Sequence, residues 1–126
     1  MVEKEWITKA GSTAAVVINP MGHRCGYVKI ERSNSLYWMD YMDAPRFNVH
    51  GGVTYSDSRE IEGTFWYGFH CNHVFDAQDP ALMDKELLAV YQLQPGLLGN
   101  KEKIRSLEYC IEECEKLAEQ LANFEK

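Results

Sequence analysis

The sequence predicts an α+β fold, in which a small and mostly antiparallel β-sheet is packed by a long C-terminal helix. Short segments rich in β-branched and aromatic residues, separated by turn residues, follow one another up to about residue 75. Beyond Lys101 the apolar residues recur at alternating steps of three and four, as in an amphipathic helix. We therefore expect one domain, residues 1–126, with a sheet region at about 5–76 and a helical region at about 80–124.

The first two predicted strands form a hairpin. Residues 13–18 (TAAVVI) are short and rich in β-branched side chains, which favours a strand. Residues 25–31 (CGYVKIE) alternate, with Cys25 and Tyr27 on one face and Val28 on the other. The turn sequence Asn-Pro-Met-Gly at 19–22 joins the two segments, so an antiparallel pair is expected.

The next segments complete the predicted sheet. Residues 33–45 are expected to form a loop or a short helix. Residues 47–55 are expected to form a strand that is interrupted at Gly51-Gly52, and residues 64–69 an aromatic strand. The polar stretch 57–63 connects these two strands.

The helical region begins with residues 81–92, which are compatible with a short helix. Residues 101–124 are predicted as one helix of 24 residues, about 36 Å long, with an apolar stripe on one side. We expect the stripe to pack on the sheet. Its resemblance to a short coiled-coil seam also leaves a role in a homo-oligomer open.

The charge balance narrows the function classes. Acidic side chains outnumber basic ones by 19 to 13, so binding of a nucleic acid polymer is not expected. No apolar run reaches the length of about 18 residues that a membrane span needs, and no signal-peptide core is visible, which favours the cytoplasm. The four cysteines are then expected to be free thiols, with Cys110 and Cys114 as core residues one helical turn apart.

The candidate chemistry lies in three short clusters that hold all four histidines: GHRCGY at 22–27, HGGVTY at 50–55, and WYGFHCNH at 66–73. Most of the 15 aromatic residues belong to the same stretch of chain. A polar site lined by aromatic rings has this composition.

The preferred interpretation is binding of a small anion with a planar base and without turnover or a cofactor. Aromatic rings would stack on the base, an arginine would hold a phosphate, and histidines would donate hydrogen bonds. The glycine pair would let backbone N–H groups approach the ligand. Because Trp66 and Phe69 lie three residues apart on a strand, we expect them to face opposite sides. The predicted binding residues are Arg24, His50, Gly51, Gly52, Tyr55, Trp66, Phe69, His73 and Asp76.

Two other chemistries remain open. In a hydrolase, His50, His73 and Asp76 would supply the general base and its orienting carboxylate, or one of these histidines would activate Cys25 or Cys71. In a metal site, two pairs of ligands spaced by one residue would form a tetrahedron; these are His23, Cys25, Cys71 and His73.

The motifs GHRCGYV, HGGVTY and WYGFHCNHVFD, with the closing helix EECEKLAEQL, resemble a family of small uncharacterised phage and prophage proteins. The resemblance covers roughly residues 12–76 and 105–122. His70 stands where the family usually has Asp, whereas Cys71, His73 and Asp76 match. The resemblance implies a phage accessory protein that acts in the bacterial cytoplasm.

The resulting hypothesis is a phage-type accessory protein that binds a small nucleotide-like ligand. By analogy with phage counter-defence factors, it would sequester a host immune signal, and shared pockets would favour a homo-oligomer. The alternatives are a hydrolase of such a nucleotide and an inhibitor that binds a host enzyme through the acidic face of the helix.

Overall fold

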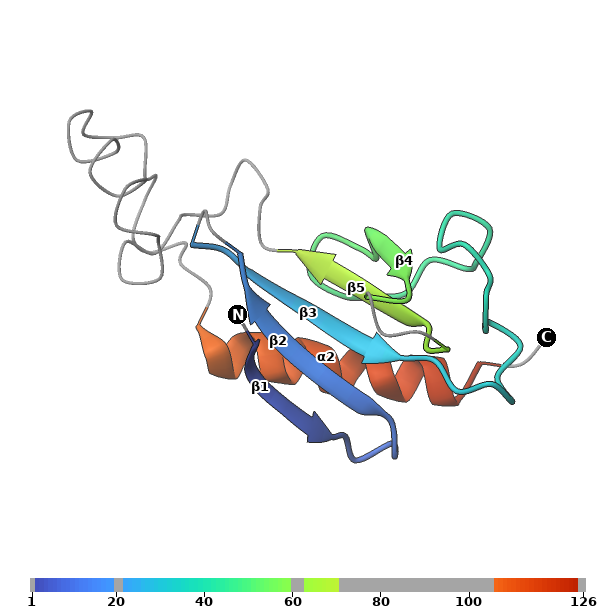
Figure 1. The fold of residues 1–126 in the computed structure, drawn as a ribbon, viewed down its shortest axis with the longest axis horizontal. Helices are drawn as coiled ribbons and strands as arrows, with labels where there is room; N and C mark the ends of the chain where they lie inside the picture. Colours follow the sequence, from blue (N-terminus) through green and yellow to red (C-terminus); the bar gives the residue numbers. More distant parts are fainter. Residues whose placement is uncertain (1, 20–21, 60–62, 71–105, 125–126) are drawn as a thin grey trace.

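A computed structural model describes residues 2–19, 22–59, 63–70 and 106–124. Within these ranges, five strands form one antiparallel sheet in the order β1-β2-β3-β5-β4, and helix α2 covers one face of it (Figure 1). This arrangement confirms the predicted α+β fold. The strands and the helix are β1 (Val2–Ile7), β2 (Thr13–Ile18), β3 (Arg24–Lys29), β4 (Tyr55–Asp57), β5 (Trp66–His70) and α2 (Leu107–Ala122).

The predicted hairpin is present as β2 and β3, which pair antiparallel with Ala15 opposite Tyr27. Strand β1 was not predicted, and it pairs with the outer side of β2. Its central residues Glu3, Lys4 and Glu5 are charged, which hides the alternation of a strand. Charged residues are common on edge strands because they discourage pairing with other chains.

The prediction of a strand over residues 47–55 was wrong. Gly51 and Gly52 have φ values of 68° and 79°, and the Gly52 N–H donates to the Val49 carbonyl at 2.8 Å. These positive φ values form a turn instead of an extended chain, and only glycine adopts them without strain. The strand therefore begins at Tyr55.

Helix α2 is shorter than predicted, with 16 residues and a length of about 24 Å. Ser106 has extended backbone angles, and its side chain accepts a hydrogen bond from the Tyr109 N–H. Such a cap begins a helix, so α2 starts at Leu107 and not at Lys101. Residues 81–92 lie outside the described residues.

The core lies between the sheet and α2. Phe69 packs against Gly26 and Cys114, whereas Trp66 lies on the other face of the sheet, as predicted. The two helix cysteines, Cys110 and Cys114, are fully buried, which confirms their role as core residues. Loop 31–54 extends the core beyond the helix through Leu36, Phe47 and Val49. The apolar stripe of α2 thus packs on its own sheet.

Within the described part of the chain, no helix combines the length and the apolar character that crossing a membrane requires.

Candidate functional site

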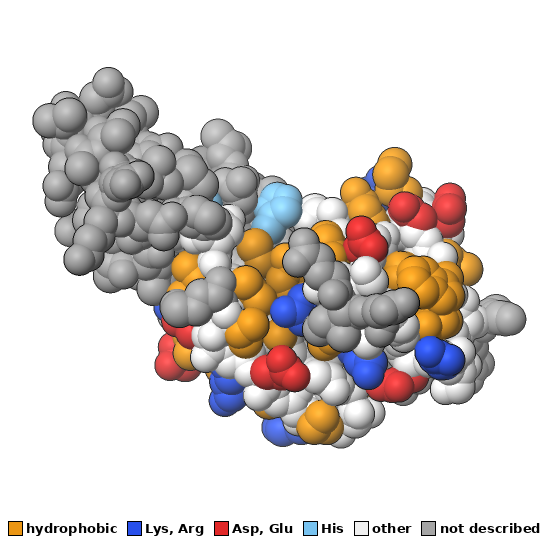
Figure 2. All heavy atoms as spheres, viewed as in Figure 1, with side chains coloured by type: hydrophobic (Ala, Val, Ile, Leu, Met, Phe, Trp, Pro, Cys, Tyr) orange, Lys and Arg blue, Asp and Glu red, His pale blue; other side chains and the backbone are white. Residues whose placement is uncertain are grey.

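The face of the sheet opposite α2, which we call the open face, carries a group of aromatic side chains. Tyr27 of β3 and Tyr55 of β4 both pair with Gly68 of β5, so both rings lie over a residue without a side chain. A Cβ atom at Gly68 would lie 2.5 Å from Cδ1 of Tyr27, which shows how closely that ring covers the strand. The two tyrosine rings meet edge to face at 5.1 Å. Figure 2 looks onto this face, where hydrophobic and basic side chains lie next to each other.

Arg59 follows β4 and places its guanidinium between two rings of the open face. Its Cζ atom lies 4.7 Å from the Tyr27 ring centroid and 4.5 Å from that of Trp66. Both separations are in the range of cation–π contacts. The backbone is fixed in the left-handed region, at φ 54°, and the Arg59 N–H donates to the Tyr55 hydroxyl at 3.1 Å. Bulky residues rarely adopt this conformation without a local reason.

The guanidinium of Arg59 carries a donor that is unused by the described residues. Its Nη1 atom is buried and has no hydrogen-bond acceptor within the described ranges. A buried donor without a partner costs about 1–3 kcal/mol, and more when it is charged. An anion at the edge of the guanidinium would supply the missing acceptor, because the two rings already cover its faces.

Two titratable side chains of β3 on the open face, Tyr27 and Cys25, have raised pKa values. Burial, with smaller contributions from Cys25 and Tyr55, raises the pKa of Tyr27 from 10.0 to about 12. Burial is also the main cause of a raised pKa at the Cys25 thiol. A nucleophilic cysteine needs the opposite shift, so Cys25 lacks the character of an activated thiolate.

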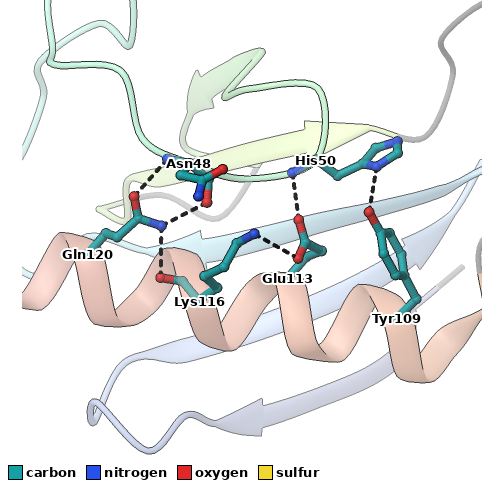
Figure 3. Close-up of polar contacts among 6 residues, drawn as sticks. All are labelled: Asn48, His50, Tyr109, Glu113, Lys116 and Gln120. Carbon is teal, nitrogen blue, oxygen red and sulfur yellow. Dashed lines mark hydrogen bonds and ion pairs between the residues drawn. The ribbon is translucent and has the colours of Figure 1, made fainter.

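His50 lies on the opposite side of the sheet, against α2 (Figure 3). Its Nδ1 atom is 2.7 Å from the Tyr109 hydroxyl, and its backbone N–H donates to Oε1 of Glu113 at 2.7 Å. The other Glu113 oxygen lies 3.2 Å from Lys116 Nζ, which compensates the charge of this buried carboxylate.

A second contact joins the same loop to the helix. The side-chain amide of Gln120 accepts from the Asn48 N–H at 2.7 Å and donates to the Asn48 carbonyl at 2.9 Å (Figure 3). Together with the His50 contacts, this pair fixes the loop that carries Gly51 and Gly52. The described contacts of His50 thus hold loop 31–54 against α2.

The structure separates the predicted binding residues. Tyr55 and Trp66 share the open face, whereas Phe69 is buried in the core on the helix side. Arg24 is paired with a carboxylate, because its Nε lies 2.7 Å from Oε1 of Glu3 and its Nη2 lies 3.1 Å from Oε2. The proposed phosphate contact of Arg24 therefore competes with an existing ion pair.

Gly51 and Gly52 line a groove of about 420 Å³ that is formed by residues 41–53 of loop 31–54. His73 and Asp76 of the predicted binding site lie outside the described residues.

Half of the predicted metal set can be placed. His23 lies just before β3, Cys25 lies on β3, and both are buried. Cys71 and His73 lie outside the described residues. Among the residues that the structure does describe, no group of three or more His, Cys, Asp or Glu side chains could hold a metal ion.

Sequence reasoning missed Tyr27 and Arg59 as site residues. Tyr27 carries a usable signal, because alternation along 25–31 places it on one face of a predicted strand. Arg59 carries none, since its position depends on a positive φ and on the register of a three-residue strand.

Comparisons of the chain with protein-family models, with curated proteins and with solved structures found no match.

Proposed function

We propose that this protein binds a small nucleotide-like anion on the open face of its sheet. The observation that carries the proposal is the Arg59 guanidinium, held between the Tyr27 and Trp66 rings with a buried N–H that lacks an acceptor in the described residues. A phosphate would bind at that edge, and the Tyr55 ring would contact the base. Of the described residues expected from sequence, the site keeps Tyr55 and Trp66, and its arginine is Arg59.

The biological setting rests on the resemblance to phage and prophage proteins. We propose a phage accessory protein of the bacterial cytoplasm that sequesters a nucleotide immune signal of the host. Binding without turnover is favoured over hydrolysis at a cysteine, because burial raises the pKa of the Cys25 thiol on this face, whereas a nucleophilic cysteine needs a lowered pKa. A homo-oligomer is part of the proposal.

A depletion and release assay tests the binding. The protein is incubated with a panel of cyclic dinucleotides and cyclic ADP-ribose isomers, and the free nucleotide is measured after filtration. We expect depletion of at least one nucleotide and its intact release when the protein is denatured by heat. A new product in the released fraction would show turnover instead, and no depletion of any nucleotide would overturn the proposal.

Matched variants test the site. Arg59→Gln removes the charge between the rings, and we expect about ten-fold weaker binding or more, since a hydrogen bond to a charged group contributes about 1.5–3 kcal/mol. Lys9→Gln serves as the control, because it removes the same charge from an exposed side chain in the turn between β1 and β2. Equal binding by both variants would contradict the site.

A further inference from the structure

Loop 31–54 exposes two large apolar side chains at one end of the sheet. Trp38 is 58% exposed and Met42 is 79% exposed. Figure 2 shows hydrophobic, acidic and basic side chains gathered over this end of the molecule. Single exposed apolar residues are common on surfaces, but tryptophan and methionine are both enriched at protein interfaces. We call the surface formed by residues 38–46 the patch.

Contacts with neighbouring segments fix the backbone of this loop. Trp38 has a φ of 66°, and its ring packs on Phe65 with centroids 5.1 Å apart. The Tyr67 hydroxyl donates to the Met39 carbonyl at 2.7 Å, and the Tyr41 N–H donates to the Ser56 hydroxyl at 3.1 Å. A left-handed conformation costs a bulky residue about 1–2 kcal/mol. The patch is therefore preorganised for a contact, which lowers the entropy lost on binding.

Two side chains of opposite charge belong to the same segment. Asp43 and Arg46 are both exposed, and neither forms an ion pair with any other described residue. Arg46 and Met42 line the same groove of about 420 Å³, together with Tyr41 and Phe47. The surface thus offers an exposed methionine, a groove, an acid and a base within one short segment.

We propose that two copies of this chain associate through residues 38–46 around a two-fold axis. In such an interface each patch meets itself, so that Met42 of one copy enters the groove of the other. Arg46 of each copy then faces Asp43 of the other, so the interface contains two equivalent ion pairs. A second copy fits this surface because it carries an acid and a base that can pair across a two-fold axis, and an exposed methionine at a groove.

Charge-reversal variants test this interface by sedimentation velocity over a concentration series. We expect the wild-type chain to dimerise with increasing concentration. Asp43→Arg or Arg46→Asp alone brings like charges together twice, and each should weaken the dimer by about ten-fold or more. In an equimolar mixture of the two variants, every charge again meets its opposite, so the dimer should return. Ile7→Ser is the control, because Ile7 is 66% exposed on β1 and lies outside residues 38–46. This variant should dimerise over the same concentration range as the wild type.

The mixture distinguishes a two-fold contact from a general effect of altered net charge. All of these substitutions are at exposed positions, so circular dichroism should show the same fold in each. A wild-type chain that stays monomeric, single variants that dimerise like the wild type, or a mixture that fails to recover the dimer would each overturn the proposal. Nucleotide binding at Arg59 is measured separately, so loss of this interface bears on the proposed homo-oligomer and not on the binding site.

Discussion

Gly26 has no room for a side chain between the sheet and α2. A Cβ atom there would lie 2.4 Å from the Phe69 ring and 2.7 Å from the Cys114 sulfur. Overfilling a packed core costs about 1–3 kcal/mol. We expect Gly26→Ala to lower the free energy of unfolding by that amount, measured by urea denaturation. A variant that unfolds at the same urea concentration as the wild type would show that the core can rearrange there.

Tyr27 and Tyr67 give the protein a dependence on alkaline pH. Burial is the main cause that raises the pKa of each phenol from 10.0 to about 12. Between these values the unfolded chain loses phenolic protons that the folded chain keeps, so ionisation favours unfolding. The stabilisation is complete below pH 10.0 and is lost as the pH rises to about 12.

Urea denaturation across this pH range measures the loss. We expect the Tyr27→Phe and Tyr67→Phe double variant to lose less stability over the same interval than the wild type. If both proteins lose the same free energy of unfolding, other groups cause the alkaline effect.

At the scale of the elements, Gln120 and Glu113 join loop 31–54 to α2. Gln120→Ala removes two hydrogen bonds to the Asn48 backbone, and each contributes about 0.5–1.5 kcal/mol. We expect lower stability and faster hydrogen exchange at the Asn48 amide. Glu119→Ala, an exposed substitution on the same helix, is the control. Exchange at Asn48 that is equally slow in both variants would show that the loop is held by other contacts.

The elements that the sequence predicted are those with a strong local pattern. The β-branched run of β2, the alternation of β3 and the apolar stripe of α2 each carry their own period. Strand β1 was missed because Glu3, Lys4 and Glu5 mask its alternation. The turn at Gly51-Gly52 was mistaken for an interruption, since the sequence does not give the sign of φ.

The sequence predicted the part of the candidate site that lies on predicted strands. Tyr55, with Trp66 or Phe69, was expected to stack on the base of the ligand, and the structure places Tyr55 and Trp66 on the open face. Arg59 could not be found, because its contacts with Tyr27 and Trp66 join three separate segments of the chain. Arg24 was expected to be available to a phosphate, whereas the unpredicted strand β1 supplies Glu3 as its partner.

At the scale of the whole molecule, the two faces of the sheet have different roles. The face under α2 holds the apolar core, and the open face carries the aromatic rings around Arg59. Loop 31–54 closes the core at one end and presents Trp38 and Met42 outward. A ligand site and a contact between copies can therefore coexist, because they involve different side chains.

The three tryptophans of the chain, Trp6, Trp38 and Trp66, offer the most direct test of ligand binding on the open face. Each gives a separate indole N–H resonance in NMR, and the Trp66 indole donates to the Thr64 hydroxyl at 3.0 Å beside Arg59. On titration with the tightest-bound nucleotide of the panel, we predict a saturable shift of the Trp66 resonance, with Trp6 unchanged. A bound nucleotide that leaves Trp66 unmoved would contradict a ligand site at Arg59.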